Sequence, residues 1–452
     1  YRSSRVIACR HLSTVTNSRK RWLLTHPQEW SGASARFWNR LLAGDDRIRR
    51  ETIKGSLDNY QHFLHKQLVA PKLSPTKRRR RNHLVRIFID WWRGEQNHEE
   101  TARALRRYLH QTVAHRESEY DLQSMARIAM SLGLFSVSLE FQGQAWRQLE
   151  KRALSTQSLD IRVRFIRSLL YQGRLHQALN EIEKINTRDL PNPLAGIVAT
   201  MERYVGWCLT QDRSTGKVET LISTKEDWED FVQGRDVLIY GPGQVDRLPS
   251  LGKGFVVARI MGPGVYRWSS GDDLVGNSTD IVYSIPENIE DARSEESGRV
   301  LDALAQYSWV CVKKTDALRT SNSRAVNTFS PLYDRGHPQM VPLAVVDLIT
   351  SGAKPYVIGS DFFASPVAYR PSDVRLVGGL DGKRQSDTGS NGGSFDRTSL
   401  MASHNIVENW SLTKNLFEAG LVSGDSGFEE VMTHSLSELM DIYDAHLGIS
   451  RI

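Results

Sequence analysis

The chain has 452 residues, of which 40% are hydrophobic and 25% are charged, and its formal net charge is +7. This composition is ordinary for a globular protein, and the length predicts two or three domains. No stretch approaches the ~18 consecutive apolar residues that cross a bilayer, and residues 1–20 contain no apolar block, so we expect a cytoplasmic protein without a secretory signal.

Residues 1–75 are expected to form a basic helical segment, in which a polar stretch with Pro71 and Pro75 acts as a linker. A basic run follows at residues 77–81. Such a run is typical of a solvated helix face, and it also suits peripheral contact with an anionic membrane at the inner face of the cell. No nucleic-acid-binding motif accompanies the charge, so we expect no nucleic acid partner.

Residues 76–228 carry apolar side chains at three- and four-residue spacing, which predicts an all-α region. Gly94, Gly133 and Gly173 are about 40 residues apart, and each lies between two helical patterns. Because glycine takes a positive φ at low cost, each is expected to mark the turn of a helical hairpin. The pattern resembles tetratricopeptide-type helical repeats, which implies a scaffold or a surface that docks an acceptor.

The pattern changes in residues 229–452. Short apolar runs alternate there with helical stretches, which is typical of an α/β Rossmann-like domain with a parallel sheet. The five runs begin near Asp236, Gly254, Asp280, Tyr307 and Pro355, and the helical stretches cover residues 287–304, 338–351 and 404–420. In such sheets the ligand lies beyond the carboxyl ends of the strands.

Cys9, Cys208 and Cys311 are widely spaced and form no Cys-x-x-Cys pair. Their odd number argues against a disulfide framework. We therefore expect reduced thiols that are buried or incidental.

Two strand ends carry candidate ligand-binding residues. The first apolar run ends in Gly241-Pro242-Gly243, where backbone N–H groups can approach a phosphate or a ribose, and the alternative is a simple tight turn. The fifth run ends in Gly359-Ser-Asp361. The Asp361 carboxylate would either orient a ligand hydroxyl or cap the loop that follows.

Residues 377–403 have almost no apolar content, which is typical of a lid that excludes water or of a disordered segment. His404 follows, where an amphipathic helix with Ser403 as its cap is expected to begin. A histidine at such a junction can titrate near neutral pH and take a proton from a substrate. The alternative is an ordinary surface or capping histidine.

Together these segments, over residues 236–432, resemble the small bacterial sialyltransferases that decorate lipooligosaccharide and use CMP-activated sialic acid. That family follows its first strand with Gly-Asn-Gly-Pro-Ser, where this chain has Gly241-Pro-Gly-Gln. It ends its second strand in Phe-Arg-x-Asn, where this chain has Ala-Arg259-Ile-Met.

Three further segments carry the resemblance. Arg335 aligns with an arginine that introduces a helix. The family's Gly-Ile-Asp-Phe-Tyr, with a second tyrosine six residues further on, corresponds to Gly359-Ser-Asp-Phe-Phe363 and Tyr369. The family's Ser-His after a flexible lid corresponds to Ser403-His404.

The resemblance implies a GT-A-variant type of Rossmann-like domain and an inverting glycosyltransferase. Such an enzyme would move a sialic acid or a related ulosonic acid from a CMP-sugar to a hydroxyl of a cell-envelope glycan or glycolipid. His404 would be the general base, Tyr369 would donate a hydrogen bond to the departing CMP phosphate, and Arg335 would add positive charge. No cofactor and no metal are expected, because CMP leaves with a single phosphate that side chains can stabilise. The residues that would hold the nucleotide-sugar are Gly241, Pro242, Gly243, Arg259, His337, Gly359, Asp361 and Phe363.

The chain also departs from that family. Met261 stands where the family has asparagine, and Phe363 stands where it has the first tyrosine of its pair. A Thr-Ser-Gly triplet reads His337-Pro338-Gln339 here. His337 would either replace a lost phosphate contact or simply precede the helix, and the donor could be a CMP-linked ulosonic acid other than sialic acid.

Two other functions fit the sequence. In the first, the protein is a non-catalytic interaction protein, whose helical repeats bind a partner and whose α/β domain is degenerate. In the second, it is a nucleotide-dependent oxidoreductase of the Rossmann type. That function would need an acidic residue after the second strand to hold a ribose, and Arg259-Ile-Met at that place argues against it.

Overall fold

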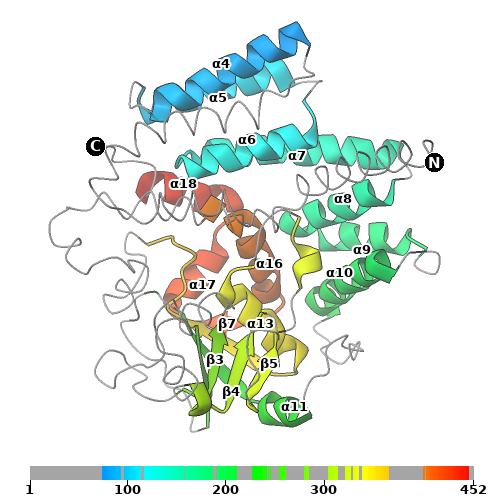
Figure 1. Ribbon diagram of the computed structural model, residues 1–452, viewed down its shortest axis with the longest axis vertical. Coiled ribbons are helices and arrows are strands. Elements are labelled where there is room, and N and C mark those ends of the chain that lie inside the picture. Colours follow the sequence, from blue (N-terminus) through cyan, green and yellow to red (C-terminus); the bar gives the residue numbers. More distant parts are fainter. Residues whose placement is uncertain are drawn as a thin grey trace, which may run out of the picture.

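The computed structural model describes most of the chain between Ser74 and His446. The described residues are 74–92, 96–113, 117–156, 158–186, 190, 192–210, 226–241, 243, 245, 254–260, 279–284, 304–313, 321–326, 329–334, 338–365, 401–402 and 404–446. Helices dominate the first half of the described chain, and a parallel sheet with packed helices forms the second (Figure 1).

The helices before the first strand form an arc around one end and one side of the molecule (Figure 1). Within the described residues they are α4 (Pro75–Trp92), α5 (His98–Val113), α6 (Glu119–Ser131), α7 (Phe135–Ser155), α8 (Leu159–Tyr171), α9 (Leu175–Glu183), α10 (Asn192–Thr210) and α11 (Glu226–Val232). We call α6 to α10 the helical array.

Glycine turns join the helices of the array in pairs, as the sequence predicts. Gly133 has φ +74° between α6 and α7, and Gly173 has φ +68° between α8 and α9. In both turns the amide after the glycine donates to a carbonyl five residues earlier, at 2.9 Å, which caps the end of the first helix. The hairpin prediction is confirmed at these two positions, whereas Gly94 lies outside the described residues.

The sheet has seven parallel strands in the order β5-β4-β3-β2-β1-β6-β7. They are β1 (Asp236–Tyr240), β2 (Val256–Ile260), β3 (Ile281–Ser284), β4 (Trp309–Val312), β5 (Ser323–Ala325), β6 (Lys354–Ile358) and β7 (Ser423–Gly424). All five expected strands are present as β1 to β4 and β6. The sequence missed β5 and β7, which have three and two residues and are too short for an apolar run.

The strand order reverses between β1 and β6. Strands β2 to β5 extend in chain order from one side of β1, and β6 and β7 lie on its other side. This arrangement confirms the predicted α/β Rossmann-like parallel sheet. It also creates a switch point at the carboxyl ends of β1 and β6, which is where open parallel sheets bind ligands.

Four helices and one 3-10 turn complete the described fold of the second half. They are η4 (Ser330–Leu332), α13 (Met340–Thr350), α16 (Ile406–Glu418), α17 (Ser426–Thr433) and α18 (Leu436–His446). The predicted helices at 338–351 and 404–420 are confirmed as α13 and α16, and residues 287–303 lie outside the described residues.

The helical array and the sheet share one hydrophobic core. Buried side chains of α8, α16 and β1 belong to the same cluster. Examples are Leu169, Leu416 and Ile239, each of which is at most 1% exposed. Burial of a side chain of this size contributes roughly 1.5–3 kcal/mol. Helices α8 to α10 and the sheet therefore stabilise each other, whereas residues of α4 to α7 also form a second buried cluster, which includes Phe88, Leu105 and Phe141.

The expected boundary between residues 228 and 229 falls inside α11. Trp228 is fully buried, stacks edge-on against Trp309 of β4, and donates its indole N–H to Ser351 at 2.8 Å. Helix α11 therefore belongs with the sheet, and the array ends before it. Within the described part of the chain, no helix is long and apolar enough to cross a membrane.

Candidate functional site at the carboxyl edge of the sheet

Three glycines join the loops that follow β1 and β6. The Gly241 amide donates to the Ile358 carbonyl at 2.8 Å, and the Gly243 amide donates to the Gly359 carbonyl at 2.6 Å. A Cβ atom at Gly241 or Gly243 would lie 2.5 or 2.7 Å from the Gly359 oxygen. Only glycine permits so close an approach, so these residues fix the geometry of the switch point.

These contacts use the backbone amides of Gly241 and Gly243, which were expected from the sequence to bind a ligand. The Gly359 amide donates to the Asp425 carboxylate at 2.8 Å, and the other oxygen of Asp425 caps α17. All three glycine N–H groups are thus used within the protein. The expectation that the Gly241 and Gly243 amides approach a phosphate needs correction, and a nucleotide at this edge would take its hydrogen bonds from other groups.

Arg259 supplies a buried positive charge near the switch point. It lies in register with Tyr240 at the carboxyl ends of the neighbouring strands β2 and β1, and it is 1% exposed. Its guanidinium carbon lies 5.2 Å from the centre of the Tyr240 ring, a cation–π contact. An anion just beyond these strand ends would lie in the field of this charge.

Asp361 caps a strained loop after β6. Its carboxylate accepts hydrogen bonds from the Phe363 and Ser365 amides, both at 3.0 Å, and from the Ser365 hydroxyl. Phe362 and Phe363 have φ of +52° and +67°, a region that costs bulky residues roughly 1–3 kcal/mol each. Of the two roles considered for Asp361, the loop cap is the one this geometry favours.

His404 lies in the turn that precedes α16. Its backbone carbonyl accepts a hydrogen bond from the Asn409 side chain at 2.6 Å, and the same side chain accepts from the Gln339 amide at 2.7 Å. Asn405 continues the turn with φ +49°. Asn409 is fully buried, whereas Gln339 and His404, its two partners, are half-buried.

The His404 turn borders the carboxyl edge of the sheet. Helix α13 returns the chain from the carboxyl end of β5 to the amino end of β6, so its first turn lies at the carboxyl edge. Gln339 is the N-cap of α13, and Asn409 joins it to His404. No local motif in the sequence points to Asn409, whose side chain bonds to His404 and Gln339, 5 and 70 residues away.

Polar side chains from the array surround the start of α16. A small hollow between them is lined by Gln123, Arg127, Gln142, Asn405 and Glu408. Glu408 is only 2% exposed. Burial, with the Glu408 charge as the next cause, raises the pKa of Tyr171 and of Tyr333 well above the ordinary range. Both phenols therefore remain protonated donors across the usable pH range.

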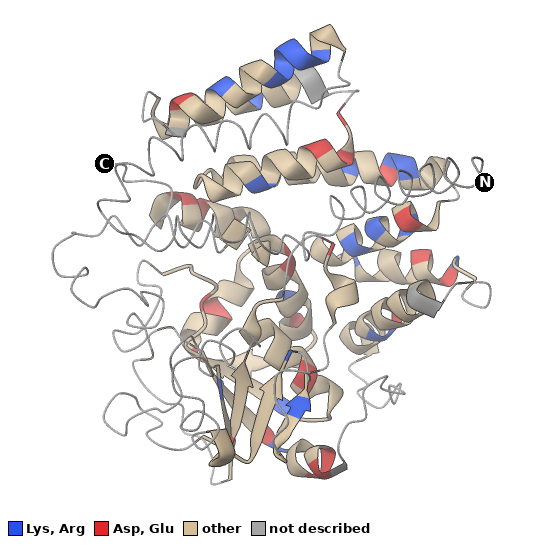
Figure 2. Cartoon of the chain, viewed as in Figure 1, with Lys and Arg blue, Asp and Glu red and all other residues tan. Residues whose placement is uncertain are grey.

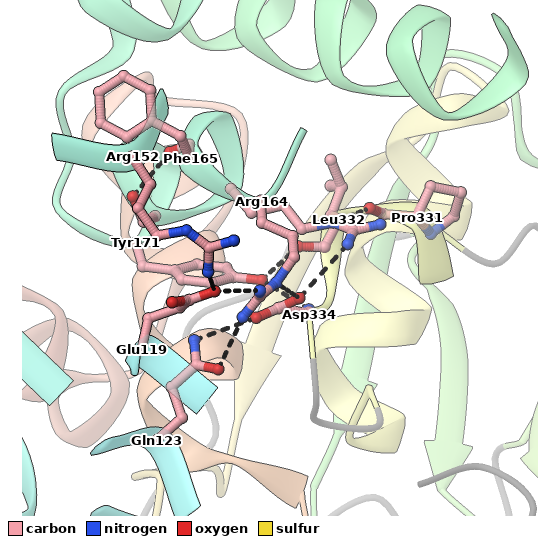
Figure 3. Close-up of polar contacts among 11 residues, drawn as sticks. Glu119, Gln123, Arg152, Arg164, Phe165, Tyr171, Pro331, Leu332 and Asp334 are labelled. Carbon is pink, nitrogen blue, oxygen red and sulfur yellow. Dashed lines mark hydrogen bonds and ion pairs between the residues drawn. The ribbon is translucent and has the colours of Figure 1, made fainter. Parts of the chain in front are cut away.

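A buried ion network ties the array to the segment before α13 (Figure 3). Arg164 of α8 donates to Asp334 at 3.2 Å, to Glu119 at 3.2 Å and to Gln123 at 2.9 Å. Gln123 in turn donates to the second oxygen of Asp334 at 3.2 Å, and Arg152 pairs with Glu119. Arg164 and Glu119 are 4% and 0% exposed, so loss of either would leave the other buried charge with one opposite charge fewer, Asp334 for Arg164 or Arg152 for Glu119.

The inner surface of the array is covered by the chain itself. Tyr204 of α10 donates to the Leu412 carbonyl at 2.6 Å, and Asn415 of α16 donates to the Leu170 carbonyl of α8 at 2.9 Å. Helix α16 thus lies against the face that a repeat array would otherwise present to a partner.

The basic run at residues 77–81 is less exposed than the sequence suggests. Lys77 and Arg81 both form ion pairs with Glu117 and Asp121, and Arg81 is fully buried. Three arginines at this end of α4, which Figure 2 colours blue for Lys and Arg, are exposed: Arg78, Arg79 and Arg80. The surface that could meet an anionic membrane is therefore smaller than the run itself.

Several candidate residues lie outside the described part of the chain. They are Pro242, Arg335, His337, Tyr369 and the expected lid at 377–400. Cys208 and Cys311 are buried free thiols, and burial raises the pKa of each to about 12. Cys9 is not among the described residues. The described residues contain no group of three or more His, Cys, Asp or Glu side chains suited to a metal ion.

We compared the chain with protein-family models, with curated proteins and with solved structures. None of the three comparisons gives a match.

Proposed function

We propose that the protein is an inverting glycosyltransferase that moves a CMP-activated ulosonic acid to a hydroxyl of a glycan or glycolipid acceptor. One observation supports this most strongly. The two loops identified from the sequence, with Gly241 after β1 and Gly359 after β6, meet at the switch point of a parallel sheet. The turn that carries His404 borders the same edge.

In the proposed reaction an acceptor hydroxyl oxygen attacks the anomeric carbon of the donor. A new C–O bond forms on the face opposite the leaving group, and the bond to the CMP phosphate breaks with its electron pair on the phosphate. His404 takes the hydroxyl proton as general base, a role that typically contributes 10²–10⁴-fold in rate. Arg259 would add positive charge near the departing phosphate.

The non-catalytic alternative has less support. It needs a free array surface for a partner, and α16 covers the inner face through its contacts with Tyr204 and Leu170. The contacts between the array and the sheet are more easily understood if the array supports a site in the same chain.

A thermal-shift screen with CMP, CDP, UDP, GDP and NAD tests the proposal. A ligand that binds only the folded state stabilises it by about 2.7 kcal/mol at one hundred times its Kd. We expect the unfolding midpoint to rise with the concentration of CMP and not with that of NAD. No response to any nucleotide at millimolar concentration would contradict the proposal, and a response to another nucleotide alone would change the donor.

A further inference from the structure

One face of α8 holds the segment that leads into α13. Arg164, Arg167 and Tyr171 are spaced three and four residues apart, which places them on the same face of the helix. Beyond the Arg164–Asp334 pair, Arg167 donates to the Pro331 carbonyl at 2.7 Å. Figure 3 shows these contacts converging on residues 331–334.

Tyr171 makes the central contact of this face. Its hydroxyl donates to the Leu332 carbonyl at 2.6 Å and accepts from the Asp334 amide at 2.9 Å. The side chain is 4% exposed, and burial holds its pKa well above the ordinary range, so the hydroxyl keeps its proton. Two backbone groups of one turn are therefore satisfied by a single array side chain.

The held segment runs along the carboxyl edge of the sheet. It connects the carboxyl end of β5 to the start of α13, and α8 holds its described residues as far as Asp334. At the start of α13, the Gln339 amide donates a hydrogen bond to the side chain of Asn409, which also donates to the His404 carbonyl. Contacts with α8 thus hold this connection at residues 331–334, and the contact through Asn409 joins its last residue, Gln339, to the turn that carries His404.

We propose that α8 is a positioning element of the site, which fixes the β5–α13 connection through Tyr171 and, through Gln339 and Asn409, sets the position of the His404 turn. The relevance of this turn to catalysis rests on the proposed function. Helix α8 then acts on the reaction without touching the substrate.

The test compares Tyr171→Phe with Tyr204→Phe in the full-length chain. Both tyrosines come from the array, both are fully or nearly fully buried, and both donate to a backbone carbonyl at 2.6 Å. Tyr204 contacts α16 itself, but it does so at Leu412 and not at Asn409, which joins Gln339 to His404. Hydrogen–deuterium exchange gives the rate of amide exchange in the peptides that cover residues 330–345 and 401–410. Modification by diethyl pyrocarbonate gives the reactivity of His404, with His434 as the internal reference.

We expect Tyr171→Phe to speed exchange about tenfold in both peptides and to change the reactivity of His404, because two buried groups lose their partner. Tyr204→Phe should leave both readouts at the wild-type value. Equal effects of the two substitutions, or faster exchange at 330–345 alone, would overturn the proposal.

Donor turnover separates this proposal from the proposed function. If the wild type releases CMP from CMP-sialic acid, Tyr171→Phe should lower kcat about tenfold and leave the Kd for CMP within about twofold. Unchanged kcat would reject the positioning role. If the wild type releases no CMP, the glycosyltransferase proposal fails, and the exchange and reactivity measurements still decide whether α8 positions the His404 turn.

Discussion

The side-chain amide of Asn409 donates to the backbone carbonyl of His404 at 2.6 Å. The other end of that amide accepts from Gln339 at 2.7 Å, so one buried side chain joins the first turn of α16 to the first turn of α13. The position of His404 at the edge of the sheet therefore depends on a residue with no acid–base chemistry of its own.

Replacement of Asn409 by leucine should lower both stability and activity, and it should lower activity more than the loss of another buried asparagine of the same helix does. The substitution removes the Asn409 partner of the Gln339 amide and of the His404 carbonyl, two half-buried groups, at roughly 1–3 kcal/mol each. Asn415→Leu is the matched control, because Asn415 is a buried asparagine of the same helix that bonds only to the array. We expect CMP release from the donor to fall at least about tenfold further in the first variant. Equal rates of CMP release by the two folded variants would show that the contacts of Asn409 with Gln339 and His404 play no part in the mechanism.

Gly241→Ala should destabilise the protein and abolish the response to CMP. The new methyl group would lie 2.5 Å from the Gly359 carbonyl and push apart the loops after β1 and β6, at about 1–3 kcal/mol. Gly206→Ala in α10 meets no atom within 4 Å and should stabilise the helix by roughly 0.5–1 kcal/mol. Thermal unfolding with and without CMP measures both effects. A Gly241→Ala protein that keeps the full CMP response would show that the nucleotide binds elsewhere.

Asp444 should make the stability of the fold depend on pH in the acid range. Burial alone would raise the pKa of this carboxyl, but the nearby His98 ring and hydrogen bonds from the Ser136 hydroxyl and from the amides of Ser136 and Phe135 lower it below the ordinary value. A lowered folded-state pKa adds stability above the unfolded-state pKa, and this stability is lost as the pH falls through the folded-state value.

The corresponding experiment compares the unfolding free energies of the wild type and Asp444→Asn between pH 7 and pH 3. At pH 7 the substitution should cost about 0.5–2 kcal/mol, because Asp444 caps the start of α7. The difference should shrink as the pH falls below about 4. Asp160→Asn, at an exposed position, is the control. A difference between wild type and Asp444→Asn that stays constant down to pH 3 would contradict this assignment.

A fragment of residues 226–452 should not fold cooperatively. The array supplies part of the common core, and Arg164 and Tyr171 supply the partners of Asp334 and Leu332. Without them the fragment would expose apolar surface and buried polar groups. Circular dichroism during heating measures this, with the full chain as reference. A fragment with one sharp transition near that of the full chain would show that the sheet is an independent domain.

The sequence was sufficient for the regular parts of the fold. The apolar runs at β1 and β6 identify the central strands, and Gly133 and Gly173 identify the hairpin turns, because these signals depend on near neighbours in the chain. Strand β7 has two residues, and its pairing with β6 is a property of the folded sheet alone.

The site was predicted less completely, for the same physical reason. Gly241 and Gly359 are recognisable as turn residues, yet their mutual contact uses the very amides assigned to a phosphate. Asp334 and Asn409 have no local motif, because their partners are as many as 211 and 70 residues away. Arg81 belongs to an apparently solvated basic run and is buried only because Glu117 and Asp121 face it in the fold.

The most direct test of the account is the release of CMP from CMP-sialic acid, in the presence of a lipooligosaccharide acceptor, by the wild type and by His404→Ala. We expect steady release by the wild type, a rate at least about a hundredfold lower for the variant, and equal CMP affinity for both. Undiminished release by His404→Ala would remove His404 from the mechanism, and a wild type that neither binds nor releases CMP would contradict the glycosyltransferase assignment.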